Sequence, residues 1–304
     1  MSGFSIDELK ESLLSSIASL LENRNEYLNN PAADFTRHKL ISFEKTILFS
    51  LIAEGGTLST EILNYFPAEK MPTASALIQQ KHKIKTKAYE DLFKNFTDKL
   101  PVLNTIKGLR AIAVDGSHLN APYNPRDEFS YTNSIKDRKG HNELVLNAAY
   151  DPINNVFLDA VIQGYHSMNE PGAYCTMVDR YACDPYSALF IMDRGYATYN
   201  TIAHSIHNKQ YFLIRAKQSF VYGLSKDNSV LHGTEEFDER ITIHIGRKNT
   251  QNCRMYENYH CLRKSTRTYD YLRDDDDIDT LSFRVLRIKI NDSLTEYIVT
   301  HLPE

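Results

Sequence analysis

Two apolar runs, IAVDGSHLNA at residues 112–121 and LFIMDRGYAT at residues 189–198, are each interrupted by an aspartate, Asp115 and Asp193. The residues before each aspartate have the length and the β-branched or apolar content of a strand that is buried on both faces. A carboxylate that follows such a strand must leave the core and needs a partner. The two aspartates are therefore the first candidates for a functional site.

The sequence around these runs predicts an α/β order of elements. Strands are expected at RAIAVDG (110–116), ALFIMD (188–193) and YFLIRAK (211–217), an antiparallel hairpin at ELVLNAAY (143–150), DPINN (151–155) and VFLDAVIQ (156–163), and helices at EPGAYCTMVDRYA (170–182) and YNTIAHSIHNK (199–209). The order is strand, strand, strand, helix, strand, helix, strand. It is the layout of a ribonuclease-H-like α/β domain, a mixed sheet with flanking helices, and we assign residues 106–216 to its first part.

In this layout the first strand and the strand after the first helix can be neighbours, which would bring Asp115 and Asp193 together. Two carboxylates a few ångströms apart repel by roughly 1 kcal/mol in water and by about 4 kcal/mol at an effective dielectric constant of 20. A cation between them removes this repulsion. Mg²⁺, or Mn²⁺ in its place, accepts carboxylates, water and substrate phosphate oxygens, so the pair predicts phosphodiester hydrolysis or transfer.

Either aspartate alone has a simpler explanation, because most aspartates at strand ends form turns or cap helices. The glycines that follow the two aspartates strengthen the functional interpretation. Gly116 follows Asp115 directly, and Gly195 follows Asp193 by two residues. Glycines there leave room for a phosphate or a metal-bound water to approach the backbone.

The flanking regions differ from this central part. Residues 1–105 have helical apolar spacing, and the segment 73–93 is locally basic, which predicts either a helical module that grips DNA or a solvated helix face. Residues 217–304 predict a β-rich insertion, because ITIHIGR (241–247) and FRVLRIKI (283–290) alternate in the manner of strands with one wet face.

Bulk properties exclude several classes of protein. The formal net charge is −4, so affinity for DNA must come from a local basic patch. We expect a cytoplasmic protein that neither crosses nor binds a membrane, because the sequence has no signal-peptide pattern and no long uncharged apolar stretch. The cysteines and the His-x2-His pair fit no zinc spacing and are expected to be free thiols and an ordinary helix face; these residues are Cys175, Cys183, Cys253, Cys261, His204 and His207.

Basic residues near the two aspartates are candidates for DNA contact. The candidates are Lys136, Arg138, Lys139 and His141 between the first two strands, Arg194 beside Asp193, and Arg215 and Lys217 at the end of the last core strand. They can steer phosphate toward the metal. The alternatives are a plain loop for the first group and a structural ion pair for Arg194, Arg215 and Lys217.

Several stretches together resemble the DDE transposases of bacterial insertion sequences, of the type named for insertion sequence 4. They are AVDGS (113–117), KGHNELVLNAAYD (139–151), NEPGAY (169–174), DRGY (193–196) and YFLIRAK (211–217). The resemblance extends to FTRHKLISFEKTILF (35–49) and SALIQQKHKI (75–84). It implies a magnesium-dependent enzyme that nicks transposon ends and joins them to target double-stranded DNA, with Asp115 and Asp193 as its first two catalytic and metal-binding acids, and it suggests a homodimer.

The sequence departs from this family in one respect. The family's third acid is a glutamate in the pattern Tyr-x2-Arg-x3-Glu-x6-Lys on a later helix, and no such pattern is present. TEYIVTHLPE (295–304) resembles the strand before that helix, so we expect a chain that is truncated before its third acid. The alternative to an active transposase is an inactive DNA-binding remnant that competes for transposon ends.

Overall fold

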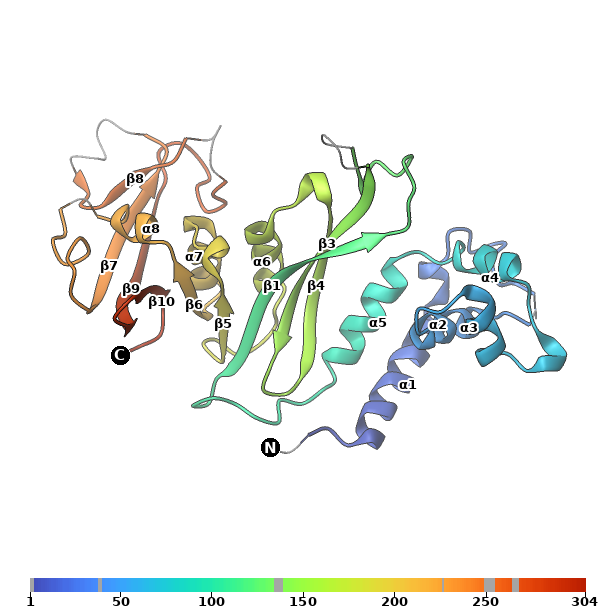
Figure 1. Cartoon of the computed structure of the whole chain (residues 1–304). Helices are drawn as coiled ribbons and strands as arrows, with labels where there is room; N and C mark the ends of the chain where they lie inside the picture. The colour runs from blue at the N-terminus through green and yellow to red at the C-terminus, as the bar shows by residue number, and fades with distance from the viewer. Residues whose placement is uncertain (1–2, 38–39, 134–138, 226, 249–254, 264–267) are drawn as a thin grey trace. The chain divides into compact units, whose positions relative to one another are not determined.

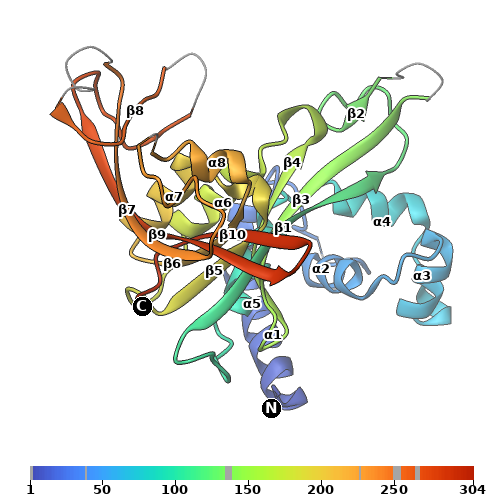
Figure 2. The ribbon, with the colours of Figure 1, turned by 60° about the vertical axis from the view of Figure 1, so that its left-hand side comes forward.

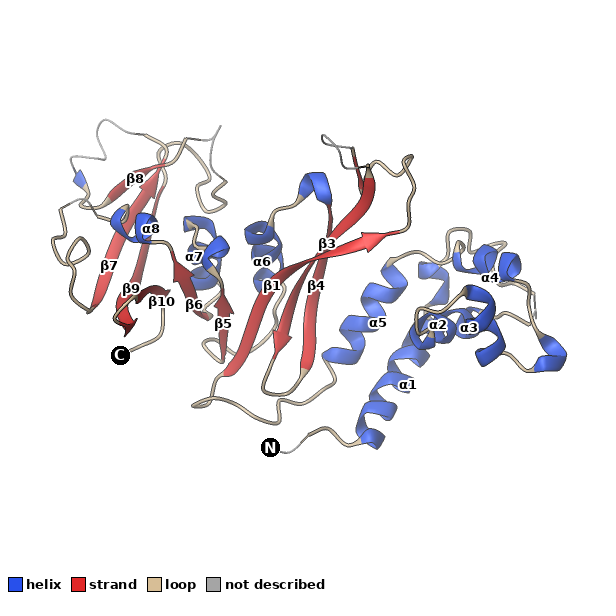
Figure 3. Ribbon diagram, viewed as in Figure 1, coloured by secondary structure: helices blue, strands red, loops and turns tan. Residues whose placement is uncertain are grey.

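The computed structural model of the 304-residue chain describes residues 3–37, 40–133, 139–225, 227–248, 255–263 and 268–304 (Figure 1). The chain divides into two compact units, Met1–Leu103 and Asn104–Glu304. Within the described ranges, no helix is both long enough and apolar enough to span a bilayer. Figure 3 shows that the first unit is helical and that the strands belong to the second.

The first unit consists of short helices around two small apolar cores. Its helices are α1 (Ile6–Glu22), η1 (Arg24–Tyr27), α2 (Phe43–Ile52), α3 (Leu58–Tyr65), η2 (Ala68–Lys70), α4 (Ala74–Lys81) and α5 (Lys87–Thr97). Ser5 and Glu8 form a capping box that begins α1, as their spacing favours. Leu20, Ile47 and Leu92 bring α1, α2 and α5 into one core.

Three lysines of the basic segment are engaged inside this unit. The ammonium group of Lys83 lies 3.9 Å from Asp34, Lys85 donates to the backbone carbonyl of Glu26 at 2.9 Å, and Lys87 pairs with Asp91. Lys83 and Lys85 lie in the connection between α4 and α5, and Lys87 is the first residue of α5. DNA binding by the segment stays a prediction.

The second unit contains one mixed sheet. Its strands are β1 (Arg110–Ala121), β2 (Tyr131–Thr132), β3 (His141–Asp151), β4 (Val156–Gly164), β5 (Ala188–Met192), β6 (Tyr211–Ala216), β7 (Phe237–Gly246), β8 (Tyr259–Cys261), β9 (Ile278–Asn291) and β10 (Leu294–Thr300). The core order is β4-β3-β1-β5-β6; β3 is antiparallel to β1 and β4, and β5 is parallel to β1 and β6. The predicted ribonuclease-H-like sheet is confirmed.

Helices α6 (Glu170–Asp179) and α7 (Tyr199–His207) pack against each other on one face of this sheet (Figures 1 and 2). The side chain of Asn169 caps α6 by accepting from the Gly172 amide at 3.1 Å. The rings of Tyr174 in α6 and Phe190 in β5 meet edge to face, with centroids 5.6 Å apart. The helix-covered face of β5 is therefore the one that carries Phe190.

The β-rich region continues the core sheet. β10 pairs antiparallel with β6, and β9, β7 and β8 follow in that order (Figure 2). The predicted strand at 283–290 falls within β9, and the one at 241–247 falls within β7 except for its last residue, Arg247. Short helices fill the connections: η3 (Tyr165–Ser167), η4 (Arg194–Tyr196) and α8 (Gln218–Tyr222).

Candidate active site at the edge of the sheet

Asp115 lies inside β1, which continues to Ala121 and is therefore longer than the expected strand at 110–116, and Asp193 directly follows β5. The two residues are neighbours at the carboxyl end of β5, which we call the edge of the sheet. The parallel ladder between β1 and β5 ends with the pair Val114 and Met192, and each aspartate is the next residue along its strand. The backbone of Asp193 is extended, with φ −83° and ψ 179°, so it continues the direction of β5. Adjacent strands are about 4.8 Å apart. The edge therefore carries two acids from positions 78 residues apart in the sequence.

Both aspartates leave the sheet on the face opposite α6 and α7. Ile112 is level with Phe190, whose side chain meets α6, and side chains alternate between faces along a strand. Asp115 and Asp193 have the opposite parity and are exposed. Asp115 Oδ1 accepts a hydrogen bond from the amide of Gly116 at 2.9 Å, which leans the carboxylate toward the following residue.

Arginines predicted to contact DNA surround Asp193. Arg215, at the end of β6, places Nη1 3.4 Å from Asp193 Oδ1 and Nη2 2.8 Å from Glu296 Oε1. Arg194 Nη2 donates to both oxygens of Glu296 at 2.7 Å. The hydrogen bond from Arg215, followed by the one from Arg194, lowers the pKa of Glu296, and the same contact raises the pKa of Arg215. Glu296 thus holds two guanidinium groups beside Asp193.

The oxygen donors at this edge suit Mg²⁺, which binds through one or two carboxylates and keeps water and phosphate as its other ligands. In the part of the chain that the structure describes, no three His, Cys, Asp or Glu side chains stand close enough together to hold a metal ion. Two exposed carboxylates leave the open coordination that a phosphate substrate requires.

The remaining predicted DNA-contact residues lie away from the aspartates or outside the described ranges. Lys217 precedes α8 and lines a cavity together with Arg194. His141 begins β3, seven residues from the partner of Asp115, Ala148, so it is roughly 23 Å along the strand. It pairs with Glu143 at 3.2 Å, and Lys139 is exposed beside it. Lys136 and Arg138 lie outside the described residues.

Comparison with known proteins gives the family of the chain. A family described as "Transposase DDE domain" matches residues 106–291, which is more than half of the chain. The chain belongs to the DDE transposase domain family. A solved structure similar to this chain is that of the piggyBac transposase synaptic complex with hairpin DNA, with 7% sequence identity and a TM-score of 0.40. That similarity covers 100% of this chain, which spans about half (54%) of the piggyBac chain. No curated protein matches this chain.

Sequence reasoning missed one acidic side chain of this DDE domain. Glu170, in the first turn of α6, points its carboxylate into the space beside the two glycines that follow the aspartates. A Cβ atom added at Gly116 would meet Glu170 Oε1 at 2.5 Å, and one added at Gly195 would lie 3.7 Å from Glu170 Oε2. The signal in the sequence is an acid at the start of the helix that follows the hairpin, a position that is also typical of an ordinary helix start.

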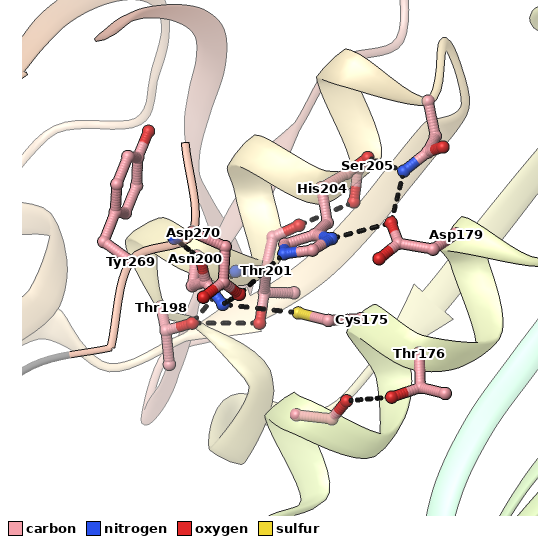
Figure 4. A network of polar contacts seen from close by, with 12 residues as sticks. Cys175, Thr176, Asp179, Thr198, Asn200, Thr201, His204, Ser205, Tyr269 and Asp270 are labelled. Atoms are coloured by element: carbon pink, nitrogen blue, oxygen red, sulfur yellow. Dashed lines mark hydrogen bonds and ion pairs between the residues drawn. The ribbon is translucent and has the colours of Figure 1, made fainter. Parts of the chain in front are cut away.

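A cavity of about 1010 Å³ lies between α6, α7, α8 and the β-rich region of the DDE domain. Its wall contains the polar network in Figure 4. His204 of α7 contacts Asp179 of α6 through Nδ1 at 2.7 Å and Asp270 of the β-rich region through Nε2 at 3.0 Å. Asn200 donates to Asp270 at 2.8 Å. The sequence predicts an ordinary helix face at His204. In the structure this side chain connects α6 of the core with the β-rich region.

Proposed function

We propose that this chain is a DNA transposase of the bacterial insertion-sequence-4 type, which cleaves transposon ends and transfers the cut strand to target DNA. The observation that supports the proposal is the register of β1 and β5, which puts Asp115 and Asp193 on adjacent strands directly after the last pair of the ladder, inside the region that matches the DDE domain family. Phosphoryl transfer needs stabilisation of negative charge and precise positioning more than a protein nucleophile.

Asp115 and Asp193 would hold Mg²⁺, which Mn²⁺ can replace. The ion supplies Lewis-acid stabilisation of the phosphate oxygens when it is bound. The chain itself contributes the two carboxylates and their exposure at an open edge. Arg215 contacts Asp193 and so keeps that carboxylate at the edge, while its guanidinium remains within reach of a phosphate.

Double-stranded DNA is the proposed substrate. Arg194, Arg215 and Lys217 lie around Asp193 and the adjoining cavity, where they can hold phosphates next to the cleavage point. Lys139 and His141, at the far end of the β1 and β3 strands, would contact the same duplex farther along; we extend this role to Lys136 and Arg138. Two copies of the chain would hold the two transposon ends.

Cleavage of its own element tests the proposal. The substrate is a linear fragment that contains the coding sequence and several hundred base pairs of its genomic flanks. With Mg²⁺ or Mn²⁺, the chain should nick this fragment at discrete positions, and Asp115→Asn and Asp193→Asn should each lower the rate by at least about 10³-fold. Glu128→Gln, an exposed loop substitution, should cleave like the wild type. Equal cleavage by the aspartate variants would contradict the mechanism.

A second candidate function is DNA binding without cleavage. A chain of this kind would bind the terminal segments of the fragment, leave them uncut with either metal, and inhibit a full-length transposase in trans. Gel-shift titration of the flanks, run beside the cleavage assay, separates the two functions.

A further inference from the structure

One largely buried glutamate holds two arginines at the edge of the sheet. Arg194 Nη2 donates to both oxygens of Glu296 at 2.7 Å, and Arg215 Nη2 donates to Oε1 of the same residue at 2.8 Å. The side chain of Glu296 is only 13% exposed, whereas those of Arg194 and Arg215 are 40% and 46% exposed. A ligand that approaches this edge therefore meets the guanidinium groups and not the carboxylate.

Backbone pairing sets the position of this glutamate relative to Asp193. The parallel ladder between β5 and β6 ends with the pair Met192 and Ile214, so Asp193 and Arg215 are the next positions on the two strands. On β10, Glu296 lies two residues before the partner of Arg215 in the antiparallel ladder. Side chains two residues apart on a strand share a face of the sheet. Glu296 is thus fixed beside Arg215 by the pairing of β10 with β6.

Glu296 is a closer acidic partner of Arg215 than Asp193 is. Arg215 Nη2 lies 2.8 Å from Glu296 Oε1, whereas its Nη1 lies 3.4 Å from Asp193 Oδ1. The hydrogen bond from Arg215 is also the main cause of the lowered pKa of Glu296. Without this glutamate, the guanidinium would turn toward Asp193 and away from an approaching ligand.

The cluster of Glu296, Arg194 and Arg215 carries more positive charge than the carboxylate can balance. Arg194 already donates to both carboxylate oxygens, and one guanidinium is enough to neutralise one carboxylate. Arg215 adds a second guanidinium, so the cluster keeps one net positive charge. A positive charge that is exposed beside the proposed cleavage point suits a DNA phosphate.

Stability alone does not explain this arrangement. A second half-exposed guanidinium on the same carboxylate adds little to the free energy of unfolding. Among the described residues, Arg194 Nε is buried and has no hydrogen-bond partner, and an unpaired buried N–H group is destabilising. A side chain that is held at such a cost needs another explanation, and ligand binding is one.

We propose that Glu296 is a positioning residue for DNA binding, which presents Arg194 and Arg215 to the phosphate next to Asp193. Its carboxylate does not touch the phosphate and acts through the two arginines. The inference rests on the proposed function, which supplies the substrate and the phosphate contacts of the arginines. It adds an acid on β10 as the group that sets their geometry.

The sign of one substitution tests this role. If only net charge mattered, removal of an acid from a surface that binds DNA would strengthen binding, because phosphates are negative. Glu296→Gln keeps the shape of the side chain and releases both arginines. We therefore expect binding to weaken by at least about tenfold, and the slope of log K against log salt concentration to fall by about 1 to 2.

The measurement is fluorescence anisotropy of the purified full chain with a labelled duplex from the genomic flank of the coding sequence, without divalent metal. Asp159→Asn is the matched control. Asp159 is also a largely buried acid, with 9% of its side chain exposed, and it pairs with the half-exposed Arg180 on β4, three strands away from β5. This variant should keep the wild-type affinity and slope.

A double-mutant comparison shows whether Glu296 acts through the arginines. In a background of Arg194→Ala and Arg215→Ala, Glu296→Gln should no longer weaken binding, because the groups that it orients are gone. Thermal unfolding establishes that each variant is folded at the temperature of the titration. If Glu296→Gln does not fold, Glu296→Asp takes its place. It keeps the charge and withdraws the carboxylate by one methylene, and weaker binding is again expected.

The outcomes separate this inference from the proposed function. Weaker binding and a smaller slope in Glu296→Gln, with neither change in Asp159→Asn, support the positioning role. Unchanged or tighter binding by Glu296→Gln, beside a wild type that binds and cleaves, overturns that role and leaves the proposed function standing. Equal weakening in Asp159→Asn or in the background without the two arginines also overturns it. A wild type that binds no duplex contradicts both proposals.

Discussion

Val114 of β1 and Met192 of β5 form the last pair of a parallel ladder, and an aspartate follows each of them. This register, rather than any local motif, joins two distant parts of the chain into one acidic edge. Arg215 and Glu296 enter the same edge from β6 and β10. The edge therefore combines exposed carboxylates with held guanidinium groups, and that combination suits a phosphate backbone that approaches a metal ion.

Arg215 is predicted to contribute one phosphate contact to DNA binding. Arg215→Ala should weaken binding to the genomic flanks of the coding sequence and reduce the slope of log K against log salt concentration by about 1. The measurement is fluorescence anisotropy between low and moderate salt. Arg240→Ala, an exposed arginine in β7, is the control and should keep the wild-type slope. An unchanged slope in Arg215→Ala would remove this residue from the DNA contact surface.

The ion pairs of Glu296 are predicted to make the stability of the fold depend on pH in the acid range. Its pKa is depressed below the ordinary 4.5 by Arg215 and Arg194, so the folded state favours the charged form. The stabilisation is present above pH 4.5 and is lost as pH falls through the depressed value. Glu296→Gln should therefore lower the urea midpoint at pH 7, and the difference from wild type should shrink as pH falls toward 3. A difference that is constant with pH would contradict this origin.

His204 is predicted to stabilise the docking of the β-rich region. His204→Ala removes contacts to Asp179 and Asp270 from a side chain that is nearly buried, and it should cost about 2 kcal/mol of unfolding free energy. Amide hydrogen exchange should accelerate around Asp270. His166→Ala, at an exposed histidine, should leave both quantities near wild type. Unchanged amide exchange around Asp270 would mean that the contacts of His204 do not stabilise the docking of the β-rich region.

The core of the fold was predictable because its signals are local. The DPINN turn between two apolar runs predicts the β3–β4 hairpin, which the structure contains, and Asn155 in that turn takes a left-handed backbone with φ 59°. The apolar runs before Asp115 and Asp193 predict buried strands, and β1 and β5 are the result. Each of these features depends on fewer than about a dozen consecutive residues.

The surroundings of the two aspartates were less predictable, because they depend on contacts between distant residues. Glu296 meets Arg194 across 102 positions, and nothing near Glu296 in the sequence marks it as a partner. In the sequence, Glu170 cannot be distinguished from any other acid in the first turn of a helix. Its proximity to Gly116 results from the packing of α6 on the sheet. The pairing of β10 with β6 was equally hidden, since an alternating strand does not specify its neighbour.

The most direct test of the central claim is the position of Mn²⁺ in a crystal of the chain soaked in manganese chloride. We predict an anomalous peak at the edge of the sheet, with carboxylate oxygens of both Asp115 and Asp193 at roughly 2.1 Å from it. Carboxylates that point apart at full manganese concentration, with anomalous peaks only elsewhere on the molecule, would contradict the shared metal site.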